Sequence, residues 1–222
     1  MYKGILLDID DTLYQYEPLH ELASQALFLE IEALFSIDIQ SIKVAFSAAK
    51  KIVKQNTPET AASHNRLLYI QNLCEILDID SLKHSLNFYN KYWDTFLDHL
   101  SLTKGAKTFF EQYGHLPICL LTDLTAHIQH RKVIKMGLNK WVNFMVTSEE
   151  AGCEKPHPFM FQLALHKLNL SAKDVCMIGD NYKKDVLGAR RLGIDAFWLT
   201  TDNEKKLEAG VTRISDLGDI KW

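Results

Sequence analysis

The chain has 222 residues, of which 47% are hydrophobic and 24% charged, so it can bury a sizeable core in one or two compact units. Its formal net charge of -3 lacks the excess of positive charge that is typical of proteins that bind a nucleic acid polymer or an anionic membrane surface. No uncharged apolar run approaches the roughly 20 residues that span a bilayer, and no basic region with a long apolar stretch opens the chain. We therefore expect a cytoplasmic protein without a membrane partner, whose scattered cysteines are reduced thiols.

The first predicted element is an apolar run, residues 5–7, that is typical of a short buried strand in a parallel sheet. It ends in three acids, Asp8, Asp10 and Asp11, followed by Thr12. An extended backbone would direct the carboxylates of Asp8 and Asp10 to the same side, because they are two residues apart. Clustered carboxylates are costly to bury without compensation, and a hard cation such as Mg2+ would supply it. For this segment alone, an acidic loop after an edge strand is the alternative.

The next part of the chain has a helical periodicity. Between residues 17 and 99, apolar residues recur at spacings of three and four in four separate stripes. Turn-forming residues at 57–58 and 78–81 separate the later stripes. We expect a bundle of about four amphipathic helices, in which the aromatic side chains belong mainly to the core.

After residue 100 the pattern changes to alternating helices and strands. The expected strands are residues 116–121, 144–146, 175–178 and 196–199, and the expected helices are residues 105–113, 125–136, 158–168 and 185–192. Repeated βα units of this kind predict an α/β fold, a Rossmann-like doubly wound parallel sheet with helices on both faces. We expect residues 1–16 and 100–222 to form this core domain, and residues 17–99 to form an inserted α-helical cap domain.

Polar side chains follow several of the expected strands. Thr122 comes after one apolar run, and Asp180 and Asp185 come after another, while Lys155 is held between turns next to two prolines. Ligands of open α/β sheets bind beyond the carboxyl ends of the strands. Residues distant in sequence can therefore converge with Asp8 on one pocket.

Together these segments resemble the ordered motifs of the haloacid dehalogenase (HAD) superfamily of phosphohydrolases, over nearly the whole chain. The matching residues are Asp8, Asp10 and Thr12 for the first motif, Thr122 for the second, Lys155 for the third, and Asp180 with Asp185 for the fourth. The helical insertion resembles that of the C1-cap group, subfamily I. The resemblance implies a Mg2+-dependent phosphatase that hydrolyses a small phosphate monoester, of the nucleotide or sugar-phosphate type, through an aspartyl-phosphate intermediate.

The resemblance also implies roles for the acids. Asp8 matches the family's nucleophile, and Asp10 matches the general acid that protonates the leaving oxygen and then takes a proton from water. Asp8, the main-chain carbonyl of Asp10 and Asp180 match the Mg2+ ligands, with Asp185 supporting the site. Dehalogenases of similar architecture lack an acid at the position of Asp10, because a halide leaves without a proton. A phosphate ester is therefore favoured over a carbon–halogen substrate.

The phosphate-binding set implied by the resemblance is Asp8, Thr122, Asp123 and Lys155. Thr122 would donate hydrogen bonds to the phosphoryl oxygens, and Lys155 would supply positive charge. Asp123 stands where asparagine is frequent in the family, so it either adds negative charge near the substrate or points away from the pocket. His157 stands where an acid is frequent, and we expect it to be structural or neutral.

Two residues are candidate substrate contacts. Tyr14 lies near the expected hinge, where it could line the pocket mouth or pack between domains. Arg66 precedes the third expected helix of the cap, where it could reach a carboxylate or a second phosphate of the substrate, or lie on plain surface. His127 and His130 share one face of a later expected helix, a pattern more typical of an exposed polar face than of a metal site.

Two other functions remain open on the sequence. A phosphomutase of the same fold would return the phosphoryl group to a bound sugar, and a non-enzymatic phospho-accepting switch also combines clustered acids with a threonine and a lysine. Switches of this kind, such as response-regulator receivers, have no large helical insertion. The insertion in this chain therefore favours the phosphatase. The sequence does not determine which phosphorylated metabolite is the substrate. It also does not distinguish a monomer from a homodimer.

Overall fold

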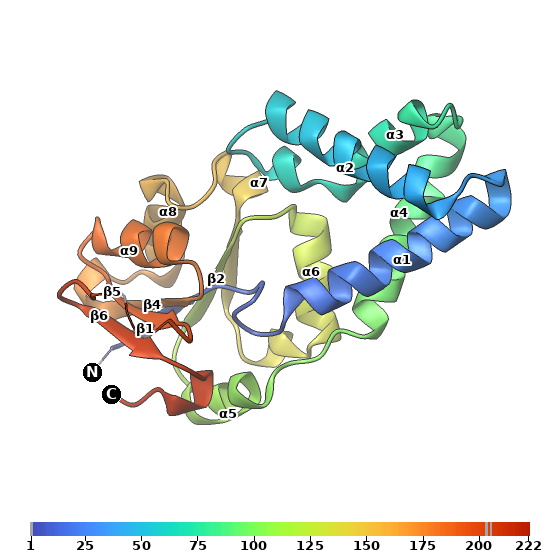
Figure 1. The fold of residues 1–222 in the computed structure, drawn as a ribbon. Helices are drawn as coiled ribbons and strands as arrows, with labels where there is room; N and C mark the ends of the chain where they lie inside the picture. The colour runs from blue at the N-terminus through green and yellow to red at the C-terminus, as the bar shows by residue number, and fades with distance from the viewer. Residues whose placement is uncertain (1, 203, 205) are drawn as a thin grey trace. The chain divides into compact units, whose positions relative to one another are not determined.

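A computed structural model of the protein describes residues 2–202, 204 and 206–222 (Figure 1). The chain divides into two compact units, one formed by Met1–Gln15 with Ser101–Trp222 and the other by Tyr16–Leu100. The first unit contains a sheet with flanking helices, and the second is helical. The helical unit is therefore inserted after the first strand of the sheet.

The α/β unit is built on a six-stranded sheet with the order β3-β2-β1-β4-β5-β6, in which every neighbouring pair is parallel. The strands are β1 (Gly4–Leu7), β2 (Ile118–Thr122), β3 (Phe144–Thr147), β4 (Val175–Gly179), β5 (Asp195–Leu199) and β6 (Val211–Ile214). The predicted Rossmann-like parallel sheet is confirmed. The edge strand β6 was not predicted, because only one of its residues, Ile214, is buried and its sequence carries no continuous apolar run.

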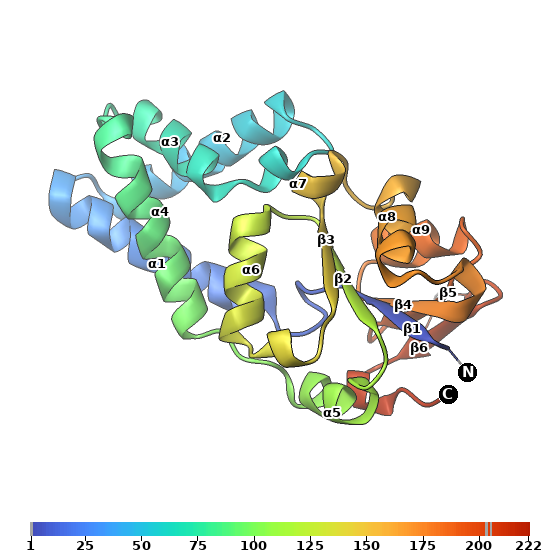
Figure 2. The ribbon, with the colours of Figure 1, turned by 180° about the vertical axis from the view of Figure 1, so that it is seen from behind.

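Helices cover both faces of this sheet (Figures 1 and 2). They are α5 (Lys104–Tyr113), α6 (Ala126–Lys135), α7 (Ser148–Ala151), α8 (Pro158–Leu168) and α9 (Leu187–Arg190), with short 3-10 turns at Leu138–Lys140, Ala172–Asp174 and Leu217–Asp219. The expected helix over 185–192 is instead a π-helical turn, Tyr182–Val186, followed by the short α9. Such turns occur frequently at functional sites, and this one directly follows the loop at the end of β4.

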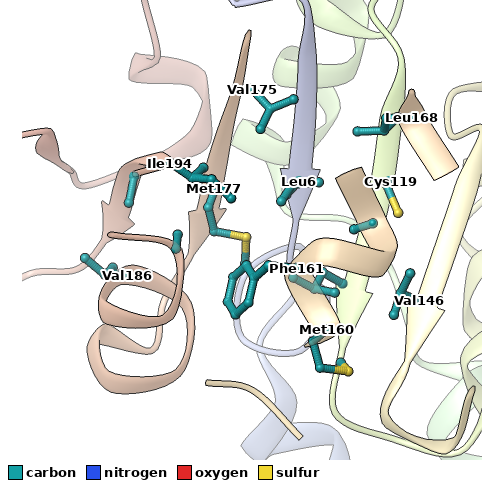
Figure 3. Packing of buried hydrophobic residues seen from close by; sticks show 14 of the residues in the cluster. Leu6, Cys119, Val146, Met160, Phe161, Leu168, Val175, Met177, Val186 and Ile194 are labelled. Atoms are coloured by element: carbon teal, nitrogen blue, oxygen red, sulfur yellow. The ribbon is translucent and has the colours of Figure 1, made fainter. Parts of the chain in front are cut away.

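The core on one face of the sheet is formed between the strands and helices α8 and α9 (Figure 3). Leu6 of β1 and Met177 of β4 point towards Phe161 and Met160 of α8, and all four side chains are fully buried. Because side chains alternate along a strand, Ile5 and Leu7 lie on the opposite face, where they are also fully buried. Burial on both faces explains why β1 is a continuous apolar run.

The helical unit comprises α1 (Tyr16–Phe35), α2 (Ile39–Asn56), a 3-10 turn (Ala61–His64), α3 (Arg66–Ile76) and α4 (Ser81–Asp98). The side chains of Asp38, Asn65 and Asp80 cap the N-termini of α2, α3 and α4 by accepting hydrogen bonds from backbone N–H groups. Aromatic rings fill much of its interior, for example Phe28 and Phe46, whose centroids are 5.4 Å apart. In the described part of the chain, no helix is both long and apolar enough to cross a membrane.

Candidate active site

The candidate site lies at the carboxyl ends of three adjacent strands. Strands β2, β1 and β4 are neighbours in the parallel sheet, so these ends meet at one edge. Asp8 directly follows β1, Thr122 is the last residue of β2, and Asp180 directly follows β4. The strand order reverses beside β1, which is where open α/β sheets bind ligands. The fold therefore brings together residues that are widely separated in the sequence.

Lys155 joins two of the acids at this edge. Its Nζ lies 2.6 Å from Asp8 Oδ1 and 2.7 Å from Asp185 Oδ1, and it donates a hydrogen bond to the backbone carbonyl of Leu121 at 2.9 Å. The three charged side chains are buried. Burial alone would lower the pKa of Lys155, but the charges of Asp185 and Asp8 raise it well above its usual range. Lys155 is therefore a fixed positive charge.

The acids at the site outnumber the charge that Lys155 supplies. Carboxylate oxygens of Asp8, Asp180 and Asp185 lie within 4.8 Å of one another. Burial, followed by the charge of Asp185, raises the pKa of Asp180 to about 6. Burial also raises the pKa of Asp8 above its usual range, against the opposing effect of Lys155. This buried, all-oxygen donor set with excess negative charge fits a hard cation such as Mg2+.

A tight turn after Asp10 returns Thr12 to the acids. Asp11 has a φ of 61°, in the left-handed region that aspartate tolerates better than most residues. The turn lets Thr12 Oγ1 donate to Asp8 Oδ2 at 3.0 Å and lie 3.3 Å from Asp180 Oδ1. Thr12 thus orients the carboxylate of Asp8, which agrees with a supporting role rather than a reactive one.

Asp10 is held by three donors. Lys132 Nζ lies 2.5 Å from its Oδ1, Gln129 Nε2 donates to its Oδ2 at 3.0 Å, and the hydroxyl of Tyr14 donates to Oδ1. Burial would raise the pKa of Asp10, but Lys132, Tyr14 and Gln129 together lower it. The structure thus places Tyr14, a predicted substrate contact, as a buried partner of Asp10.

Asp123 and Thr122 play different parts at the end of β2. Thr122 is fully buried, and its hydroxyl accepts a hydrogen bond from Gln129 Nε2. The Asp123 carboxylate accepts from the backbone N–H of Lys155 at 2.9 Å and pairs with Lys184 Nζ at 2.9 Å. Lys184 also lies 3.1 Å from Glu154. Asp123 therefore ties the β2 loop to the loop that carries Lys155.

His157 has a local structural explanation. It is the N-cap of α8, and its Nδ1 accepts a hydrogen bond from the backbone N–H of Phe159 at 3.2 Å. Pro158 follows at the first helical position, where the missing N–H has no cost. The imidazole thus fixes the start of the helix after Lys155.

Arg66 lies in the helical unit, at the start of α3. Its Nη1 donates to the backbone carbonyl of His64 at 2.8 Å, and its Nη2 donates to the hydroxyl of Tyr16. The guanidinium lies 5.0 Å from the ring centroid of Tyr69 and 6.0 Å from that of Trp93. Arg66 is 8% exposed, and its Nε has no hydrogen-bond partner. Burial would lower the pKa of its guanidinium, but the surrounding tyrosines raise it. It is therefore a buried cation among aromatic rings.

Two buried residues of the site, Gln129 and Lys132, are not among those predicted from the sequence. Both lie on α6 and are fully buried, whereas His127 and His130 of the same helix are exposed. A signal was present, because Gln129 and Lys132 share the face of the buried apolar residue Ile128. Polar residues placed inside an apolar stripe are unusual enough to mark a buried polar contact.

Comparisons with known proteins identify the family. The model of the haloacid dehalogenase-like hydrolase family matches residues 2–193. The chain is 34% identical to the ribulose-1,5-bisphosphate 5-phosphatase of Halopiger xanaduensis, over 92% of this chain and 87% of the relative. It is 28% identical to the glyceraldehyde 3-phosphate phosphatase of Methanocaldococcus jannaschii, over 94% of this chain and 89% of the relative.

Solved structures share the fold. The HAD phosphatase of Thermococcus onnurineus matches with a TM-score of 0.74 at 20% identity, over 97% of this chain and 94% of that chain. The HAD hydrolase YfnB of Bacillus subtilis, solved with bound magnesium, matches with a TM-score of 0.70 at 19% identity, over 97% of this chain and 95% of that chain. With the family match over most of its length, the chain belongs to the haloacid dehalogenase-like hydrolases.

Proposed function

We propose that the protein is a Mg2+-dependent phosphatase that hydrolyses a small sugar phosphate through an aspartyl-phosphate intermediate on Asp8. The observation that carries this proposal is the convergence of Asp8, Lys155, Asp180 and Asp185 at one edge of the sheet. An acid at Asp10 supports an oxygen leaving group, because an alkoxide needs a proton and a halide does not. The names of two relatives support the substrate class, since ribulose-1,5-bisphosphate and glyceraldehyde 3-phosphate are both sugar phosphates.

The proposed reaction has two halves. In the first, a carboxylate oxygen of Asp8 attacks phosphorus and the bond to the leaving oxygen breaks. Because the pKa of Asp10 is lowered, Asp10 takes up a proton from the bound monoanionic ester and passes it to that oxygen. In the second, water attacks phosphorus, its proton passes to Asp10, and the bond between phosphorus and Asp8 breaks. Asp10 then releases this proton, and the enzyme returns to its starting state with inorganic phosphate as the second product.

Fixed charges would stabilise the transferring group. Lys155 lies beside Asp8, where it can neutralise the phosphoryl oxygens, and Thr122 can donate its hydroxyl hydrogen to them. Both oxygens of Asp123 are bound by Lys184 and by the Lys155 backbone, which supports a role in aligning these loops rather than a side-chain contact with phosphate.

The metal site would use the clustered acids. Asp8, Asp180 and Asp185 would hold Mg2+ together with the main-chain carbonyl of Asp10, as the all-oxygen donor set supports. When bound, the ion supplies charge that offsets the repulsion between the Asp8 carboxylate and the phosphate.

The helical unit is inserted between β1 and β2, which supports a place in the C1-cap group. We propose that Arg66 in this unit recognises an anionic group of the substrate other than the transferred phosphate. Its buried guanidinium among tyrosine hydroxyls supports the assignment, because a cation without a carboxylate partner favours an anionic ligand. Tyr14 would act on the substrate through Asp10.

The test is a phosphate-release screen over pentose bisphosphates, triose phosphates, hexose phosphates and nucleotides, with Mg2+ and with EDTA. We expect wild type to release phosphate from sugar phosphates only with Mg2+, and D8N to lose at least ~10³-fold in kcat/KM because it lacks the nucleophile. D38N is a matched control, because this exposed aspartate caps α2 and asparagine caps equally well.

Equal thermal unfolding of wild type, D8N and D38N would show that the folds are intact. Equal phosphate release by wild type and D8N would contradict the role of Asp8. Release that is unaffected by EDTA would contradict the metal dependence.

A further inference from the structure

Helix α6 carries two polar side chains that are hidden from solvent. Gln129 and Lys132 are both 0% exposed, and the spacing of three places them on the same face of the helix. Burying an ammonium and an amide is unfavourable unless partners compensate. Both side chains therefore need polar partners inside the protein.

Both residues contact Asp10. The ammonium of Lys132 lies 2.5 Å from Oδ1, and the amide of Gln129 donates to Oδ2 at 3.0 Å. Tyr14 donates to Oδ1 from the other end of the same turn. With both oxygens engaged, the carboxylate of Asp10 is fixed in position and in rotation.

Gln129 also determines the direction of the Thr122 hydroxyl. The same Nε2 that donates to Asp10 donates to Thr122 Oγ1, so both of its hydrogens are used. Because Thr122 accepts from Gln129, its own hydrogen must point to another acceptor. Among the described residues, Gln129 Oε1 has no hydrogen-bond partner although it is buried. Leaving a buried carbonyl oxygen without a partner is unfavourable. The orientation of the Gln129 amide is therefore set by the two hydrogen bonds that Nε2 donates, to Asp10 and to Thr122.

We propose that Gln129 and Lys132 are positioning residues for phosphoryl transfer: they hold the Asp10 carboxylate where it exchanges a proton with the leaving oxygen, and Gln129 leaves the Thr122 hydroxyl free to donate to the phosphoryl group. This inference rests on the proposed phosphatase function. Neither residue touches the substrate in this account, because each acts through Asp10 or Thr122.

A purely structural role for Lys132 makes a different prediction. If Lys132 only compensated a buried charge, its removal would lower stability and would slow every substrate alike. A positioning role for proton transfer depends on the leaving group instead. An alkoxide leaving group needs the proton from Asp10, whereas p-nitrophenolate is stable enough to leave without it.

The experiment compares kcat/KM for the best sugar phosphate from the screen with kcat/KM for p-nitrophenyl phosphate, in K132M and Q129M. Both substitutions keep the length of the side chain and suit a buried site. We expect K132M to lose about 10²-fold on the sugar phosphate and less than about 5-fold on p-nitrophenyl phosphate. We expect Q129M to lose roughly 10-fold more on the sugar phosphate than on the aryl ester, because the general acid is less well placed. K107M, which removes an exposed lysine of α5, is the control and should match wild type on both substrates.

A double-mutant cycle with D10N separates the outcomes. In the D10N background, K132M and Q129M should add no further discrimination between the two substrates, because the group that they position is gone. Equal losses on both esters, or full discrimination remaining in the D10N double variants, would overturn the inference. If K132M does not fold, Q129M alone decides by the same criterion. If the wild-type protein releases phosphate from none of the esters, the proposed function itself is wrong. If the wild-type protein is active but K132M and Q129M lose equally on both esters, only the positioning role is refuted.

Discussion

The two units of the protein bury charge in opposite ways. In the α/β unit, Lys155 contacts the carboxylates of both Asp8 and Asp185, and Lys132 contacts Asp10. In the helical unit, the buried guanidinium of Arg66 lies among the rings of tyrosines and a tryptophan. The first unit thus surrounds its cations with an excess of acids, and the second surrounds a cation with neutral aromatic groups.

This contrast fits the ligands that we propose for the two units. An edge with more acids than cations attracts a metal ion, which in turn brings an anionic phosphate. A guanidinium without a carboxylate keeps its charge available to an anionic ligand. The consequences for stability also differ. Removing a lysine strands buried acids, whereas removing Arg66 strands no opposite charge.

The largest expected effect on stability comes from Lys155→Met. The substitution leaves Asp8 and Asp185 buried without their ammonium partner, so we expect the free energy of unfolding to fall by about 3–5 kcal/mol. Activity should also fall by at least ~10²-fold, because the phosphoryl group loses a fixed positive charge. Urea unfolding and phosphate-release kinetics measure the two effects.

The matched control is Lys184→Met. Lys184 pairs with Asp123 and Glu154, whose side chains are 12% and 9% exposed, but its own side chain is 31% exposed to solvent. Its removal should therefore cost less than that of Lys155, about 1–2 kcal/mol. Similar losses of stability in the two variants would refute the distinction between the buried network and the loop contacts.

Arg66→Met is expected to affect substrate binding and to destabilise the fold less than Lys155→Met. No carboxylate is stranded, but the backbone carbonyl of His64 and the hydroxyl of Tyr16 lose a donor, so the free energy of unfolding should fall by about 1–2 kcal/mol. The KM for a doubly phosphorylated sugar should rise about 10-fold, from loss of a charged hydrogen-bonding group, and the KM for p-nitrophenyl phosphate should not change. A loss of stability comparable to that of Lys155→Met, with unchanged KM values, would show that Arg66 is purely structural.

At neutral pH the smallest expected effect is that of His20, which influences stability only as the pH is lowered. Its Nδ1 lies 2.6 Å from the hydroxyl of Tyr92, and burial, followed by the charges of Arg66 and Lys50, lowers the pKa of His20 to about 4. Between pH ~6.5 and about 4 the unfolded chain binds a proton at this position that the folded chain does not. The stability should therefore fall as the pH is lowered through this window.

His20→Gln should weaken this pH dependence, because glutamine does not titrate. Thermal unfolding midpoints of wild type and the variant across the window test the expectation. His115→Gln, which changes an exposed histidine of the α/β unit, is the control. An unchanged slope in His20→Gln would mean that His20 does not carry this part of the pH dependence.

Much of the α/β unit could be predicted because its signals are local. Continuous apolar runs predict buried parallel strands, and the acids after those runs mark the strand ends, as Asp8 and Asp180 show. The edge strand β6 escaped prediction because its exposed side does not require apolar residues. The π-helical turn before α9 was not predicted because its sequence suits an ordinary α-helix equally well.

The partners of the site residues were harder to predict. The position of Lys132 and Gln129 within the apolar stripe of α6 indicates a buried polar contact, but only the three-dimensional path of the helix shows that the partner is Asp10. Likewise, nothing in the sequence around Asp123 points to Lys184, which lies 61 positions further along the chain. Contacts of this kind depend on how the strands are ordered in the sheet rather than on any local pattern.

The central claim is that Asp8 receives the phosphoryl group. It is tested most directly by mixing the enzyme with Mg2+ and a substrate labelled with 32P, quenching in acid within milliseconds, and mapping the label to a peptide. We predict label on the peptide that contains Asp8, removal of the label by hydroxylamine as for an acyl phosphate, and no label in D8N. Steady release of phosphate with label on another residue would contradict it.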